Sequence, residues 1–119
     1  METRSGRLEF LPQSSPNTVV LRIGFDRPVL SVAVALSGYE ARYVSSDHHV
    51  RQLTVDLHAE PGGRVDDGWE ARLVGTLYLH DDDGNSFTGW IDYLLFVELG
   101  ARPGRLEVTG PLRDAVLEG

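Results

Sequence analysis

The chain has 119 residues, enough for one domain with a hydrophobic core and too few for two. Hydrophobic residues make up 41% of it and charged residues 24%, close to the averages of soluble globular domains, so the composition excludes a disordered chain. The longest apolar run, residues 93–97, is far too short to cross a bilayer, and we expect no membrane partner.

The charge pattern excludes a second class of protein, the general nucleic-acid binders. The formal net charge is −7, acidic residues gather at residues 66–67 and 81–83, and all 11 basic residues are arginines. A general nucleic-acid binder needs a basic stripe that displaces counterions from phosphate, and the sequence has none. The absence of cysteine excludes disulfides, thiolate metal sites and thiol catalysis.

The N-terminal segment is polar. Residues 1–17 contain Pro12, Pro16 and a run of Gln and Ser, which predicts an arm or a loosely attached edge segment. The segment lacks the apolar stretch of a secretory signal. We therefore expect a cytoplasmic protein at synthesis, and release or incorporation into an extracellular particle stays open.

After this arm, apolar and polar residues alternate with a period of two, which is typical of strands. The segments with this pattern are residues 18–25, 29–37, 39–43, 50–58, 69–80, 89–99 and, less regularly, 105–110. Residues 60–68 form the strongest predicted loop, and residues 81–86 form a hairpin connection. We predict an all-β domain over residues 18–110, an antiparallel β-sandwich of six to seven strands, followed by a tail over residues 111–119.

Two predicted strands are apolar on both faces. In the first, Ala33 and Ala35 share the parity opposite the large residues; in the second, Leu94 and Phe96 lie opposite Ile91 and its neighbours. Because a domain of this size has one core, a second apolar face predicts another layer, which another copy of the chain can supply. We expect a homo-oligomer, a trimer or hexamer, with these four residues in the interface; coverage by the chain's own loops and arm is the alternative.

The motif Asp47-His48-His49 precedes a clean strand in which Leu53, Val55 and Leu57 alternate with polar residues. Extending that alternation backwards places Asp47, His49 and Arg51 inward, as an ion-paired latch at the end of the sandwich. His48 then joins an outer polar row with Gln52, Thr54, Asp56 and His58. A metal site or a metal-dependent hydrolase is the alternative, but two strand neighbours supply only two of the three or four ligands that zinc needs.

The acidic hairpin has a calcium-like spacing. Asp81, Asp83 and Asn85 occupy the first, third and fifth positions of a loop whose twelfth position is Asp92. The sixth position is Ser86, where an EF-hand has glycine, and no helices flank the loop. Calcium is therefore one hypothesis for these three residues, and an acidic turn ordered by Gly84 and Asn85 is the other.

Aromatic residues near strand ends, interleaved with short polar ones, suit carbohydrate binding. Rings stack on the apolar faces of sugars, and polar groups bond to the hydroxyls; packing in the core or an interface is the alternative for each ring. The aromatic candidates are Tyr39, Tyr43, Trp69, Tyr78, Trp90 and Tyr93. The ligand-binding residues that we predict from this pattern are Tyr43, Asp47, His48, His49, Arg51, Tyr78, His80 and Trp90.

From Phe25 onward, a Pro-led turn and a Val/Leu alternation resemble the opening of the H-type lectin domain, and residues 88–99 resemble its last strand. The resemblance covers about residues 18–99. It implies a six-stranded antiparallel sandwich that forms trimers or dimers of trimers and binds sugars such as N-acetylgalactosamine at subunit boundaries. The inserted-looking segment 59–70 and the Asp47-His48-His49 motif depart from the pattern, so no sugar-binding residue is transferred from the family.

No nucleophile motif, phosphate-binding loop or dinucleotide fingerprint is present, so we expect no enzyme. The leading hypothesis is an oligomeric β-sandwich that binds carbohydrate without any required cofactor. A structural subunit of a phage-tail or injection-type particle is the alternative, and a metal-dependent hydrolase using Asp47, His48 and His49 is a third.

Overall fold

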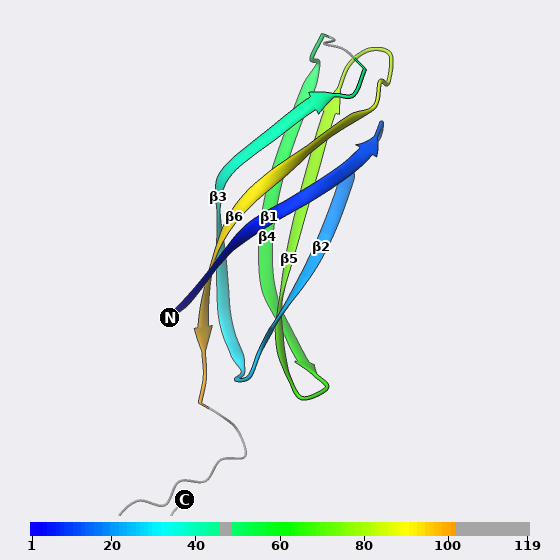
Figure 1. Cartoon of the computed structure of the whole chain (residues 1–119). Helices are drawn as coiled ribbons and strands as arrows, with labels where there is room; N and C mark the ends of the chain where they lie inside the picture. Colours follow the sequence, from blue (N-terminus) through cyan, green and yellow to red (C-terminus); the bar gives the residue numbers. More distant parts are fainter. Residues whose placement is uncertain (46–48, 102–119) are drawn as a thin grey trace, which may run out of the picture.

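The structure is a computed structural model that describes residues 1–45 and 49–101. Six strands make up the described chain: β1 (Glu2–Gln13), β2 (Asn17–Phe25), β3 (Val29–Tyr43), β4 (Gln52–Val65), β5 (Gly68–His80) and β6 (Phe87–Leu99). They form two antiparallel sheets of three strands, sheet A with the order β1-β6-β3 and sheet B with the order β2-β5-β4. The sheets face each other as two layers (Figure 1), so the predicted all-β sandwich is confirmed.

The core lies between the two central strands. On β5, Leu73 and Leu77 are fully buried, and on β6 the same holds for Ile91, Leu95 and Val97. These are the inward parities that the alternation predicts. Each such side chain contributes about 1.5–3 kcal/mol through the hydrophobic effect, so the two central strands account for much of the stability.

The segment predicted as an N-terminal arm is a strand. β1 pairs with β6 from Glu2 opposite Val97 to Phe10 opposite Gly89 and again at Gln13 opposite Phe87, and Leu8 and Phe10 are buried. The predicted edge position is confirmed, because β1 is an edge strand of sheet A, but the arm and the loose attachment were wrong. The first half of β1 is polar on both faces, which resembles a free segment. Its partner is the central strand of sheet A, more than 70 residues away, and local sequence carries no sign of that pairing.

Residues 60–68, predicted as a loop, are mostly strand. β4 continues to Val65, and the register between β4 and β5 shifts between Pro61 and Gly63, where Gly63 has φ of +90°. This is a β-bulge, which takes up an extra residue without ending the strand, and β4 is an edge strand, where proline is tolerated. The turn itself is only Asp66 and Asp67.

β3 is one strand where we predicted two, over residues 29–37 and 39–43. The strand runs on through a register shift between Leu36 and Gly38. Val32 and Val34 pack on the core as the alternation predicts, but Leu30 is 61% exposed and Leu36 is 48% exposed. Leu30 lies in a further register shift, between Val29 and Ser31, and has no partner on β6. Leu36 lies directly before the shift to Gly38 on an edge strand, whose side chains have a neighbouring strand on one side only. The predicted strand 105–110 and the tail 111–119 lie outside the described residues.

Candidate ligand-binding site

The predicted ligand-binding residues are divided between several parts of the sandwich. Asp47 and His48 lie outside the described residues. Tyr43, His49, Arg51 and His80 gather at the upper end, where the chain passes from β3 to β4 and from β5 to β6. Tyr43 is buried, its hydroxyl donates a hydrogen bond to the His49 carbonyl oxygen at 3.5 Å, and burial raises the pKa of that hydroxyl.

The predicted inward latch does not form among the described residues. Arg51 is exposed and donates to the Asp82 carboxylate at 2.8 Å, and His49 is also exposed. Strand β4 begins only at Gln52, so the alternation of Leu53 and its neighbours does not extend back to residues 47–51. The outer polar row from Gln52 to His58 is confirmed for Gln52, Asp56 and His58, which are exposed.

The predicted aromatic pair and the predicted tryptophan lie on different faces. Tyr78 and His80 stack at 5.4 Å between ring centroids on β5, on the parity opposite the buried leucines of sheet B. Trp90 lies on the outward parity of β6 in sheet A, under the guanidinium of Arg7 at 3.7 Å from the ring centroid. The Tyr78 ring also packs edge-on against Phe87 of β6, at 5.9 Å between ring centroids, so Tyr78 contributes to the packing of the core, whereas Trp90 packs under Arg7 on the outer side of sheet A.

The candidate calcium residues form an ordered hairpin. Asp81 is only 2% exposed; its Oδ1 accepts hydrogen bonds from the backbone N–H groups of Asp83 and Asn85 at 3.1 Å, and its Oδ2 accepts one from the Asn85 side chain at 2.7 Å. The Asn85 amide, followed by the backbone donors, lowers the pKa of Asp81 to about 2. Over the described residues, no three His, Asp or Glu side chains are placed to hold a metal ion, and calcium stays a prediction.

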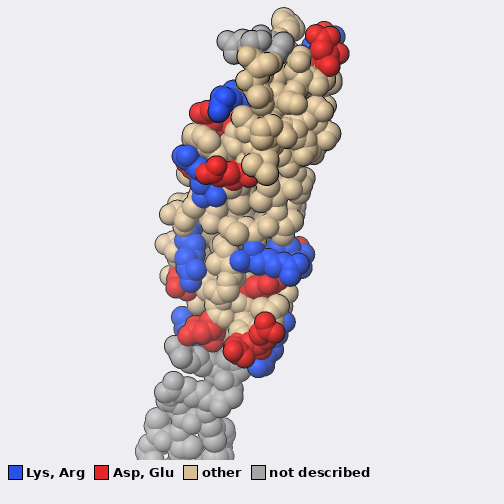
Figure 2. Space-filling model, turned by 45° about the vertical axis from the view of Figure 1, so that its right-hand side comes forward, with Lys and Arg blue, Asp and Glu red and all other residues tan. Residues whose placement is uncertain are grey.

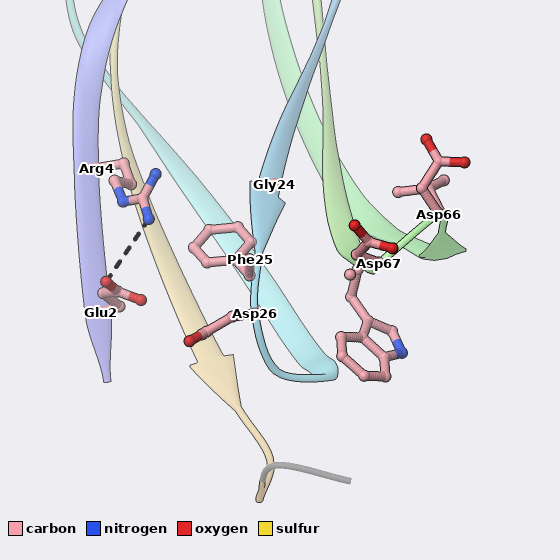
Figure 3. Close-up of a pocket in the computed structure, with 10 residues that line it drawn as sticks. Glu2, Arg4, Gly24, Phe25, Asp26, Asp66 and Asp67 are labelled. Atoms are coloured by element: carbon pink, nitrogen blue, oxygen red, sulfur yellow. Dashed lines mark ion pairs between the residues drawn. The ribbon is translucent and has the colours of Figure 1, made fainter. Parts of the chain in front are cut away.

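Besides a hollow of about 410 Å³ beside Tyr43 at the upper end, the described residues form a hollow at the opposite, lower end of the sandwich. It measures about 540 Å³ and opens between the start of β1 in sheet A and the end of β2 and the β4–β5 turn in sheet B (Figure 3). We call it the lower hollow. Its lining residues are Glu2, Arg4, Gly24, Phe25, Asp26, Val65, Asp66, Asp67, Gly68 and Trp69.

Two aromatic rings lie in the lower hollow, opposite each other in the β2–β5 pairing. Phe25 and Trp69 are register partners, and each ring has an arginine beside its face: Arg4 is 4.6 Å from the Phe25 centroid and Arg64 is 5.0 Å from the Trp69 centroid. Close backbone approach fixes this end, because a Cβ at Gly68 would lie 2.6 Å from the Phe25 carbonyl oxygen. The rings are therefore held by paired strands rather than by a free loop.

Four carboxylates and one guanidinium supply the polar groups. Glu2 pairs with Arg4 at 3.7 Å, Asp26 follows β2, and Asp66 and Asp67 form the two-residue turn, in which Asp66 has φ of 42°. In Figure 3 the Asp26 side chain lies beside the Phe25 ring, Asp67 lies across the β2 ribbon near the β4–β5 turn, and the Asp66 carboxylate points away from the Phe25 ring.

Phe25 is only 7% exposed and belongs to the core, whereas Trp69 is half-buried, so Trp69 is the ring that a ligand reaches. Carboxylates accept hydrogen bonds from hydroxyl groups, and aromatic rings stack on apolar ring faces, so the lower hollow combines the two contacts that a sugar offers.

Sequence reasoning found only parts of this site. Trp69 was among the aromatic candidates, and Asp66 and Asp67 were recognised as an acidic pair, but Glu2 and Arg4 were assigned to an arm. The alternation places Phe25 on the inward face, and its burial confirms this. The missing signal was the pairing of β1 with β6, which brings residues 2–4 to the same end of the sandwich as residues 24–26.

Comparison of the chain with protein-family models, with curated proteins and with solved structures finds no match in any of the three. Within residues 1–45 and 49–101, no helix is long and apolar enough to cross a membrane.

Proposed function

We propose that the protein is a non-enzymatic binding module whose lower hollow binds carbohydrate. The observation that supports this function is the meeting of Phe25 and Trp69 with four carboxylates in one hollow of about 540 Å³. That volume falls in the range of small-ligand sites and accommodates one or two sugar rings. The proposal moves the binding site from the upper end, where the sequence placed it, to the lower end.

Charge defines which sugars fit. Arg4 and four carboxylates line the lower hollow, so its formal charge is negative. Carboxylated or sulfated sugars would meet like charges in a partly desolvated site, which costs binding free energy. We therefore expect neutral sugars, with N-acetylgalactosamine as the first probe because the H-type lectin resemblance implies it, and we expect sialylated glycans to bind more weakly.

A glycan array followed by titration calorimetry tests the function. The two tryptophans of the chain offer a matched pair, because Trp69 lines the lower hollow and Trp90 lies on the outer face of sheet A. Trp69→Ala should weaken binding of the strongest array ligand at least about tenfold, as loss of a central aromatic contact does, and Trp90→Ala should leave it unchanged. An array with no neutral glycan above background would contradict the proposal, as would equal effects of the two substitutions.

A structural subunit is the second candidate function. The observation that favours it is the uncharged part of the outer face of sheet A, which a neighbour in an assembly can cover. Two results would support this candidate over carbohydrate binding. The first is a stable oligomer that binds no glycan on the array, and the second is genome neighbours that encode sheath or tube proteins. The metal-dependent hydrolase is tested by metal analysis of protein purified without chelator.

A further inference from the structure

The outer face of sheet A has an uncharged centre that crosses all three strands. The pairings place Thr3 of β1, Phe96 of β6 and Ala33 of β3 in one row, and Ser5, Leu94 and Ala35 in the next. We call these six residues the sheet A patch. Leu94 and Phe96 are half-buried between the exposed smaller side chains, so the larger groups lie in the middle of the sheet A patch.

Charged residues border the sheet A patch on both sides. Toward the upper end lies the row of Arg7 and Asp92, joined by two hydrogen bonds at 2.7 and 3.1 Å, and toward the lower end lies Glu98 opposite Ser31. An apolar centre with a polar rim is the usual anatomy of a protein interface. In Figure 2, charged side chains lie along one side and at the lower end of the visible face, and its upper part shows few.

We propose that two copies of the chain pack with their sheet A patches against each other, about a twofold axis. A flat face is covered completely by one other flat face, whereas three flat faces around a threefold axis each leave part of their area uncovered. The outer face of sheet B offers no second patch of this kind, because ion pairs such as Arg72–Glu60 at 2.6 Å lie across it. The inference is independent of the carbohydrate proposal and differs from the trimer that the resemblance implies.

The area of the face sets the expected affinity. An axis between the Leu94 and Phe96 rows lies toward the lower end of sheet A, so only the lower part of the three strands is covered, on the order of 400 Å² per copy. That is below the usual area per partner of specific interfaces, so weak association, with dissociation in the upper micromolar range, follows. The proposed dimer should therefore form and dissociate within the concentrations that a solution experiment reaches.

The rim residues favour one orientation. If the strands of the two copies run in opposite directions, with the axis between the Leu94 and Phe96 rows, Glu98 of each copy lies over the row of Arg7 and Asp92 in the other. The axis places β6 over β6, so Glu98 then faces the Asp92 carboxylate, which Arg7 already neutralises. If the strands run in the same direction, Glu98 faces Glu98, which is repulsive. The antiparallel arrangement is therefore the less repulsive of the two.

Analytical ultracentrifugation of the full chain from about 5 to 500 µM tests the dimer. The expected mass rises from that of the 13.1 kDa chain to twice that value. Ala35→Glu and Ser5→Glu, at exposed positions with no part in the core, should each weaken association at least about tenfold. Val20→Glu, which adds the same charge at an exposed position of sheet B, is the matched control and should leave it unchanged.

Three results would overturn the proposed dimer: a monomer across the whole concentration range, a trimer, or a dimer that Ala35→Glu leaves intact. Circular dichroism establishes that each variant is folded before its mass is interpreted, and Ser5→Glu serves if Ala35→Glu does not fold. Glu98→Gln then tests the orientation. Unchanged association is the expected result for the antiparallel arrangement, in which Glu98 faces the neutral Arg7–Asp92 pair, and tighter association, from relief of the Glu98–Glu98 contact, would overturn it.

Discussion

The two outer faces of the sandwich differ in how charge is distributed across their central strands. On sheet A, the rows of Leu94 and Phe96 are uncharged across all three strands. On sheet B, the single apolar row of Val20 and Val74 lies between a row containing Arg22 and Arg72 and a row of polar groups. The hydroxyls of Thr18 and Thr76 bond to each other at 3.0 Å in that polar row.

This difference between the two outer faces is the basis of the proposed contact between two copies of the chain. A sheet needs only one apolar face to form a core, and sheet B follows that pattern with ion pairs outside. Sheet A has apolar residues on both faces of β6, and its second face has no use in the isolated sandwich. We therefore propose self-association through sheet A and a sheet B that faces solvent, with the lower hollow between the sheets left for the proposed ligand.

The largest expected effect is on the free energy of unfolding, and it distinguishes the inner face of β6 from its outer face. Leu95 is fully buried, so Leu95→Ala should lower the free energy of unfolding by about 2–5 kcal/mol. Its neighbour Leu94 is half-buried on the outer face, so Leu94→Ala should cost about 1 kcal/mol or less when measured on dilute, monomeric protein. Urea denaturation gives both values.

A core-sized loss for Leu94→Ala in dilute protein would show that the chain itself covers the outer face of sheet A. In that case the contrast between the two outer faces would not imply a partner. Val74→Ala on sheet B provides the corresponding measurement for the face that we leave in solvent.

A smaller effect concerns the hairpin that joins sheet B to sheet A. The pKa of Asp81 lies at about 2 in the folded chain, because Asn85 and the neighbouring backbone donate hydrogen bonds to its carboxylate, whereas an unfolded aspartate titrates near about 3.9. The folded-state pKa is depressed, so this stabilisation is present above about pH 4 and is lost as the pH falls through about 2. Melting temperatures should therefore fall over this window, and less steeply in Asp81→Asn.

Asp83→Asn is the control for this pH dependence, because the Asp83 side chain is exposed and only its backbone N–H contacts Asp81. Equal slopes for wild type and Asp81→Asn between pH 2 and pH 4 would show that the carboxylate does not stabilise the hairpin. The connection between the two sheets would then not depend on the Asp81 carboxylate.

Much of the fold could be predicted from the sequence because sandwich strands alternate with a period of two. Leu73, Leu77, Ile91 and Leu95 follow that period on central strands, where both neighbours enforce it. The alternation fails at edges and bulges: Leu36 is exposed because β3 has a neighbour on one side only, and the Gly62-Gly63 bulge resembles a loop.

The candidate site was harder to predict because it depends on topology. Residues 2–4, 24–26 and 65–69 meet only after β1 pairs with β6 and β2 pairs with β5, and no local pattern reports those pairings. The sheet A patch, in contrast, was visible in part. Ala33, Ala35, Leu94 and Phe96 were expected at an interface from strand parity alone, and the structure adds that Ala33 pairs with Phe96 and Ala35 with Leu94.

The contrast between the two outer faces is tested most directly by hydroxyl-radical footprinting of Phe96 in solution. At about 500 µM we predict that Phe96 is labelled more slowly in the wild type than in Ala35→Glu, and that dilution to about 5 µM removes the difference. Val20 on sheet B should be labelled equally in both proteins at both concentrations. Equal labelling of Phe96 in wild type and variant at the high concentration would contradict the account, because the outer face of sheet A would then be as open to solvent as that of sheet B.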